Sequence, residues 1–105
     1  MAKISRFKLE KDTERLILKQ LVKIFKEINK EDDIDALFDN LFTRSEKIIL
    51  AKRIAIAILL EKEWDYFRIG KKLKVSHATI SFVKNSKLGA SPAYQQLFKG
   101  LENVF

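Results

Sequence analysis

The sequence predicts a single domain built only from α-helices. A length of 105 residues is the usual size of one domain, and an apolar share of 47% is enough for a packed core. Three glycines and one proline are too few for the many corners of an all-β domain. Apolar residues instead recur at intervals of three and four, the spacing that places them on one side of a helix. We therefore expect one all-α domain spanning residues 1–105.

The first two expected helices are amphipathic. The first runs from Asp12 or Thr13 to Ile28, and a shorter one opens in residues 31–42, which hold five acids and no base. Carboxylates near a helix N-terminus complement its dipole, so these acids fit a helix start better than a metal site. The apolar residues expected on the two helices are Leu18, Leu21, Val22, Phe25 and Ile28, then Ile34, Leu37, Phe38 and Leu41.

The third expected helix is apolar on nearly all sides. Residues 43–46 have the pattern of a capping box, and the helix should run from there to about Lys62. Only Lys52 and Arg53 interrupt the apolar run of residues 48–60, which is too short for a membrane span of roughly 20 residues. A helix of this kind must be covered on nearly all sides, and one small chain offers few neighbours. We therefore expect an obligate homodimer with this helix at its centre.

Residues 65–87 have the pattern of a helix-turn-helix. Two short helices that cross at a sharp turn need a small residue where they touch, and Gly70 takes that position. Ser76 is expected to cap the second helix. Lys74 stands in the turn, where glycine is preferred, so the turn should be strained or longer. The apolar positions of the pattern are Ile69, Leu73, Val75, Ile80 and Val83. A helical hairpin with a purely structural role is the alternative.

A sixth helix is expected at the end of the chain. Gly89 fits the left-handed residue that ends a helix, and Ser91 with Pro92 fits an N-cap followed by proline at the first helical position. The apolar residues expected on this helix are Tyr94, Leu97, Phe98, Leu101 and Phe105.

Composition and charge narrow the class of function. The chain has no cysteine and one histidine, so we expect no disulfide, no thiol nucleophile, no metal site and no cofactor. The N-terminal residues contain no apolar run suited to secretion, which predicts a cytoplasmic protein. The net charge is +7, and residues 64–90 hold six bases against one acid, Asp65. A small basic helical protein of this kind is a candidate for binding a polyanion.

Together these residues make the chain similar to the Trp repressor superfamily, its branch of small bacterial Trp-repressor-like proteins included. The resemblance extends from about Leu21 to Val104. It is carried by the entry into the third helix at residues 41–46, by residues 52–56, by residues 76–81 and by residues 85–92. It implies a six-helix, intertwined homodimer that binds operator DNA.

The resemblance also implies a place for a small-molecule effector. Two arginines sandwich the corepressor in that family, and Arg53 matches the first of them, while Thr43 matches a threonine that lines the site. The second arginine falls at Phe82, whose ring can stack on an indole but cannot pair with a carboxylate. We therefore expect regulation without tryptophan. Phe82 should either fold back towards the third helix or meet a thymine methyl, and Arg53 could instead pair with an acid or a helix end at the dimer interface.

The second helix of a helix-turn-helix enters the major groove of DNA. Because Ile80 and Val83 face the core, the outward side chains near the start of this helix are expected to contact bases. These base-reading residues are Ser76, His77, Ala78 and Ser81. The residues expected to hold phosphates are Arg68, Lys71, Lys72, Lys74, Lys84 and Lys87. Asn85, two turns along the helix, is more suited to a phosphate than to a base.

These expectations combine into a sequence-specific regulator of transcription that binds double-stranded DNA as a homodimer. Repression by occluding a promoter is the simplest mechanism for a domain with no added module. An enzyme is not expected, because the one histidine, His77, has no acid at helical spacing. The alternative is an adapter dimer that kept the scaffold and lost specific DNA binding. The bases around the second helix favour DNA over that alternative.

Overall fold

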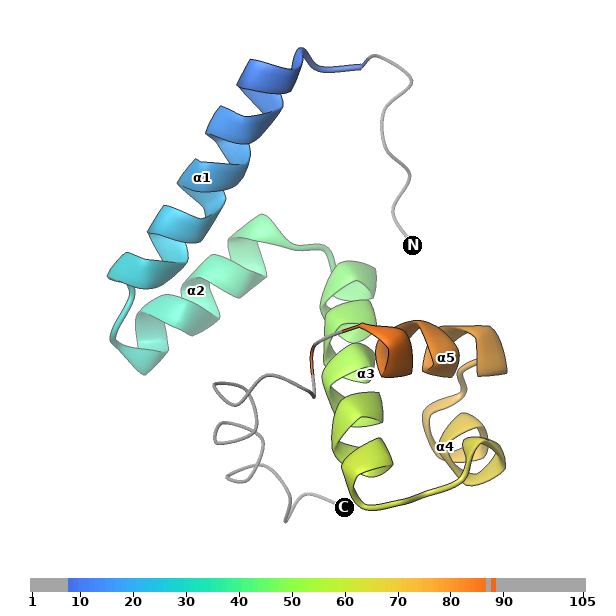
Figure 1. The fold of residues 1–105 in the computed structure, drawn as a ribbon. Coiled ribbons are helices and arrows are strands. Elements are labelled where there is room, and N and C mark those ends of the chain that lie inside the picture. Colours follow the sequence, from blue (N-terminus) through green and yellow to red (C-terminus); the bar gives the residue numbers. More distant parts are fainter. Residues whose placement is uncertain (1–7, 87, 89–105) are drawn as a thin grey trace. The chain divides into compact units, whose positions relative to one another are not determined.

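The computed structural model describes residues 8–86 and 88, and within them every regular element is a helix (Figure 1). The five helices of this part are α1 (Lys11–Glu27), α2 (Glu31–Leu41), α3 (Arg44–Glu61), α4 (Tyr66–Leu73) and α5 (His77–Asn85). The all-α prediction is confirmed for these residues. Gly89 and the helix expected after Ser91 lie outside them, so the sixth helix stays a prediction.

The chain divides into two compact units, residues 1–47 and residues 48–105, and the continuous helix α3 crosses the boundary between them. The single-domain prediction therefore remains a prediction. The ends of the helices agree closely with the sequence pattern. The first helix ends at Glu27 rather than Ile28, and the third at Glu61 rather than Lys62.

In the first unit, α1 and α2 are in contact through aromatic rings. The ring of Phe38 lies 5.9 Å from that of Phe25 and 5.5 Å from that of Phe42, centroid to centroid. Three acids occupy the first turn of α2, the arrangement expected from the dipole argument. Yet neither α1 nor α2 has a buried residue. The apolar stripes predicted for these helices exist, but within the described residues they are largely uncovered.

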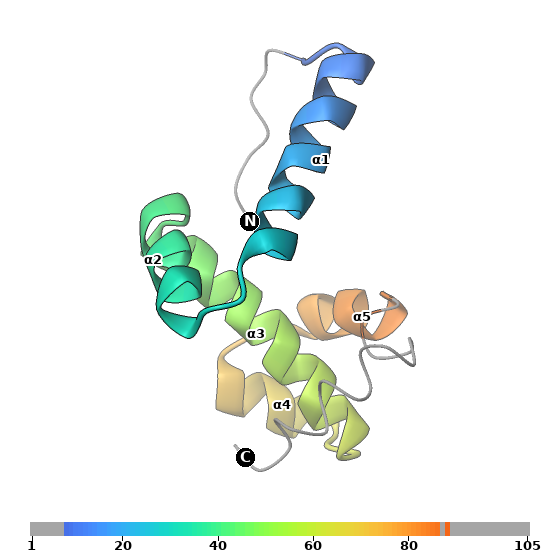
Figure 2. The same cartoon turned by 90° about the vertical axis from the view of Figure 1, so that its left-hand side faces the viewer.

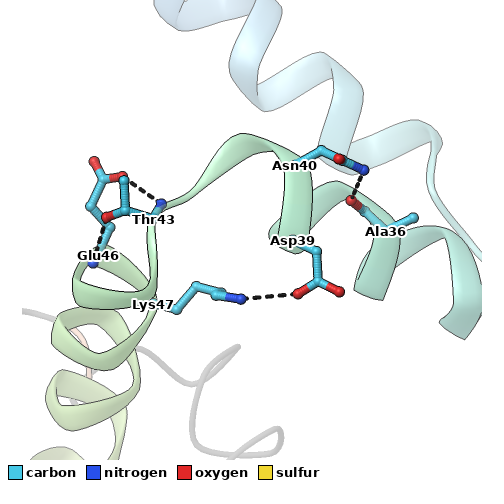
Figure 3. Close-up of polar contacts among 6 residues, drawn as sticks. All are labelled: Ala36, Asp39, Asn40, Thr43, Glu46 and Lys47. Carbon is cyan, nitrogen blue, oxygen red and sulfur yellow. Dashed lines mark hydrogen bonds and ion pairs between the residues drawn. The ribbon is translucent and has the colours of Figure 1, made fainter.

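The start of α3 is the predicted capping box (Figure 3). The backbone amide of Thr43 donates to Oε1 of Glu46 at 2.8 Å, and the amide of Glu46 donates to Oγ1 of Thr43 at 3.1 Å. These bonds satisfy amides that no helical carbonyl can reach. The bond from the Thr43 backbone to the Glu46 carboxylate is the main cause of a lowered pKa at Glu46, and hydrogen bonding from the Thr43 side chain to this carboxylate lowers it further. An ion pair of 2.9 Å between Lys47 and Asp39 lies beside the box.

The second unit has a small apolar core made by three helices. The end of α3 contributes a continuous run of four buried residues, and α4 and α5 lie against it (Figure 2). The buried residues of this core are Ile56, Ala57, Ile58, Leu59, Ile69, Ile80 and Val83. Leu73 and Val75 pack against the core, so all five apolar positions of the helix-turn-helix pattern are confirmed.

The first turns of α3 are more exposed to solvent than the prediction of a helix covered on nearly all sides requires. Ile48, Leu50 and Ile54 are 41%, 38% and 40% exposed. The described part of one chain therefore covers only the C-terminal half of this apolar helix. The second chain that was expected to cover the rest remains a prediction.

The turn between α4 and α5 is short and strained, as expected from Lys74. This residue adopts the left-handed conformation, with φ 56° and ψ 53°, and its amide donates to the carbonyl of Gly70. A Cβ on Gly70 would lie 3.1 Å from the carbonyl oxygen of Val75, which explains why a small residue is needed there. The ammonium group of Lys52 in α3 lies 3.4 Å from the Lys74 carbonyl oxygen.

Replacing Lys74 with glycine should stabilise the protein. A left-handed conformation costs a residue with a Cβ about 1 kcal/mol more than glycine. We expect Lys74→Gly to raise the free energy of unfolding by about 1 kcal/mol, measured by urea denaturation. Lys74→Ala is the matched control, since it removes the same charge and keeps the strain. Equal stabilisation by both variants would show that the charge, not the backbone, is responsible.

Removing the Thr43 hydroxyl should weaken the cap and raise the pKa of Glu46. Because the folded state lowers this pKa, the stability from ionised Glu46 is present above the ordinary carboxyl pKa and is lost as pH falls through the lowered value. Thr43→Ala should cost about 1 kcal/mol of stability. An NMR titration of the Glu46 carboxyl should show its pKa rising in this variant and unchanged in the control Ser45→Ala. An unchanged pKa in Thr43→Ala contradicts the account.

Candidate nucleic-acid interface

Both helices of the helix-turn-helix begin with a capping side chain. Oδ1 of Asp65 accepts a hydrogen bond of 2.7 Å from the amide of Arg68 at the start of α4. Oγ of Ser76 accepts one of 3.2 Å from the amide of Thr79 at the start of α5, and it lies 3.0 Å from the Thr79 hydroxyl. The predicted cap at Ser76 is confirmed. Its hydroxyl is thus already engaged within the helix, and contact with a base remains a prediction.

The exposed side of α5 is the one that the sequence pattern predicts. Ile80 and Val83 are buried, whereas His77 and Ala78 are exposed. Ser81 is half-buried. An imidazole, a methyl group and a hydroxyl therefore stand near the beginning of this helix, where they can offer hydrogen bonds and an apolar contact to a partner.

The predicted phosphate-binding cations are exposed on the helix-turn-helix. Arg68, Lys71 and Lys72 lie on α4 at helical spacings of three and four, Lys74 lies in the turn and Lys84 lies on α5. None of the five forms an ion pair with another residue that the structure describes. Lys87 lies outside the described residues. The surface of α4, the turn and α5 therefore carries exposed positive charge without an ion pair to a carboxylate within this part.

Aromatic rings lie against two of these cations, a feature that the sequence analysis missed. The guanidinium carbon of Arg68 is 4.1 Å from the ring centroid of Trp64, and Nζ of Lys84 is 5.8 Å from that of Tyr66. Stacking uses the flat face of a guanidinium and leaves its N–H edges available for a phosphate. Trp64 precedes α4 and Tyr66 lies on a different helix from Lys84. Helical spacing alone could therefore not have revealed either pair.

Two of the three predicted effector residues lie together. The guanidinium carbon of Arg53 in α3 is 5.0 Å from the ring centroid of Phe82 in α5. Phe82 is nevertheless 55% exposed, because the guanidinium covers only part of the ring. Of the two expectations for Phe82, the approach to α3 is present but leaves much of the ring exposed, and contact with a thymine methyl remains a prediction. Thr43 belongs to the other compact unit, where it caps α3.

Lys52 and Arg53, the interruptions in the apolar run of α3, both reach the helix-turn-helix. Lys52 lies against the Lys74 carbonyl in the turn, and Arg53 lies over Phe82. Arg53 forms a cation–π contact rather than an ion pair among the residues that the structure describes. These two polar residues of α3 thus contact the turn and α5.

The comparisons with known proteins identify one family. A family model described as Trp repressor protein matches residues 17–102, which is most of the chain. No curated protein and no solved structure matches. No helix in the described part is long and apolar enough to cross a membrane.

Proposed function

The chain belongs to the Trp repressor family, a family of DNA-binding regulators, and we propose that it is a sequence-specific repressor that binds double-stranded DNA as a homodimer. The observation that carries this proposal is the exposed, positively charged surface of α4, the turn and α5. Unneutralised cations on such a motif suit a phosphate backbone. An adapter dimer on the same scaffold would not need them.

In the proposed complex, α5 enters the major groove with its first turn foremost. His77 and Ser81 would donate or accept hydrogen bonds at base edges, and the methyl group of Ala78 would meet a thymine methyl. Ser76 would approach the same bases. The cations would hold the backbone, which orients the protein but carries no sequence information. These cations are Arg68, Lys71, Lys72, Lys74, Lys84 and Lys87.

Dimerisation is supported by the apolar surface that the described chain leaves uncovered. In the second unit the uncovered residues include Ile48, Leu50 and Ile54 of α3, and in the first unit, taken by itself, they include Leu18 and Val22 of α1. Apolar surface of this extent on a small protein is typical of a protein–protein interface. A two-fold dimer would present two copies of α5, and these fit half-sites about one helical turn of DNA apart.

We further propose that tryptophan is not needed as a corepressor. The contact of 5.0 Å between Arg53 and Phe82 supports this, because a ring of the chain itself occupies one side of the guanidinium. Phe82 also lacks the charge that would hold the carboxylate of an amino acid. The proposed repressor would thus bind its operator whenever the dimer is present.

The affinity for DNA should change in different ways when a phosphate-binding cation is removed and when a base-contacting side chain is removed. Lys72→Ala should weaken binding to all duplexes about equally and reduce the slope of log affinity against log salt by roughly 1. His77→Ala should instead cost roughly 1–3 kcal/mol at one base pair and relax the preference there. Fluorescence anisotropy with labelled duplexes at several salt concentrations measures both effects.

Lys19→Ala, which removes an exposed cation from α1, is the control for net charge in that experiment. Its affinity and salt slope should stay close to those of the unmodified protein. Failure of the unmodified protein to bind any duplex at low salt would contradict DNA binding and favour the adapter.

If α3 lies in a dimer interface, one charged substitution on its exposed apolar side should dissociate the dimer. Leu50 is 38% exposed in the described chain, so Leu50→Glu should be tolerated in a monomer but would bury a charge in a dimer interface. We expect light scattering to show a dimer for the unmodified protein and loss of the dimer for Leu50→Glu. Unfolding of the unmodified protein should also depend on its concentration.

Phe67→Glu is the matched control, because it places the same charge on an exposed residue of α4. This variant should remain dimeric. A stable, folded monomer of the unmodified protein at micromolar concentration would contradict the dimer proposal.

A further inference from the structure

Tyr66 occupies a position between the two helices of the helix-turn-helix. It is the first residue of α4, and its half-buried ring packs against the apolar core. The ring meets the imidazole of His77 edge to face, with centroids 5.6 Å apart and an angle of 86° between the planes. The ammonium group of Lys84 lies 5.8 Å from the same ring centroid. One side chain of α4 therefore touches two side chains of α5.

The two partners of Tyr66 lie on the same side of α5. His77 and Lys84 are seven residues apart, which is close to two full helical turns. His77 is at the end of α5 proposed to contact bases, and Lys84 is among the cations proposed to hold phosphates. The Tyr66 ring is thus in contact with one residue of each kind.

The anchoring of Tyr66 makes these contacts suitable for orienting α5 side chains. The preceding residue, Asp65, caps α4 through the amide of Arg68, which holds the start of that helix in place. An imidazole on an exposed first turn would otherwise rotate freely and lose that freedom on binding. An aromatic edge-to-face contact restrains it, and the negative face of a ring attracts an ammonium group.

We propose that Tyr66 is a positioning residue that determines specificity at the base pair contacted by His77. It holds the imidazole and the Lys84 ammonium group in their binding orientations before DNA arrives. This inference rests on the proposed function. The neighbouring Phe67 on the same helix is 70% exposed and makes no ring contact among the described residues, so it offers a matched control.

The test begins with duplexes selected by the unmodified protein from a randomised pool. Discrimination at each base pair is then measured for Tyr66→Leu, which keeps apolar packing and removes the ring, and for Tyr66→Phe, which keeps the ring. At the pair contacted by His77, Tyr66→Leu should lower discrimination about 10-fold, in the range of a lost base contact. Tyr66→Phe and the matched control Phe67→Leu should leave it unchanged.

A double-mutant cycle separates positioning from general destabilisation. His77→Ala alone should abolish discrimination at its base pair, and adding Tyr66→Leu should cause no further loss there. The salt slope of Tyr66→Leu should also fall by up to about 1, because Lys84 is released. Additive effects of the two substitutions, or full discrimination in Tyr66→Leu, would overturn the inference.

A second measurement needs no variant and covers the case in which Tyr66→Leu does not fold. NMR of the unmodified protein should show nuclear Overhauser effects between the ring protons of Tyr66 and His77, both free and bound to the selected duplex. Their loss in the complex would overturn the inference.

If the pool yields no preferred sequence, both the proposed function and this inference fail. If a sequence is selected and Tyr66→Leu behaves like the unmodified protein, the positioning role alone fails.

Discussion

The burial of Ile69, Ile80 and Val83 of the helix-turn-helix against the end of α3 is the constraint on which the second unit depends. Ile69 of α4 and Ile80 of α5 are fully buried with Ile56 and Leu59 of α3. Gly70 lets the backbone of the turn approach α4, at the cost of a left-handed Lys74. Because this core faces inwards, the opposite side of α5 must face outwards. The candidate interface is therefore a consequence of the packing.

Charge and aromatic rings act on the surface that this core leaves exposed. The cations of α4, the turn and α5 make no ion pairs among the described residues, but rings hold Arg68 and Lys84 in place. Arg53 and Lys52 of α3 also reach the motif, at Phe82 and at the Lys74 carbonyl. Such contacts limit the motion of long side chains without neutralising their positive charge, a combination suited to binding a polyanion.

The predictions from sequence were correct where a structural feature depends on residues close together in one helix or one cap. The box at Thr43 and the cap at Ser76 depend on residues three apart, and the apolar positions follow helical spacing, so both were predicted correctly. Contacts between α4 and α5 were missed, because the pairs Tyr66–His77 and Tyr66–Lys84 depend on how these helices cross. The approach of Phe82 to α3 was one of two expectations, and the structure shows it, but the fraction of the ring that Arg53 leaves exposed is not encoded in local spacing.

In the proposed complex, α5 and the cations around it form the surface that binds DNA. The most direct measurement is an NMR titration that follows backbone amides as a selected duplex is added. We expect the largest shifts at the start of α5, in the turn and at the cations of α4, with small shifts along the buried residues of α3. Shifts concentrated on α1 and α2, with the amides of His77 and Ser81 unmoved, would contradict it.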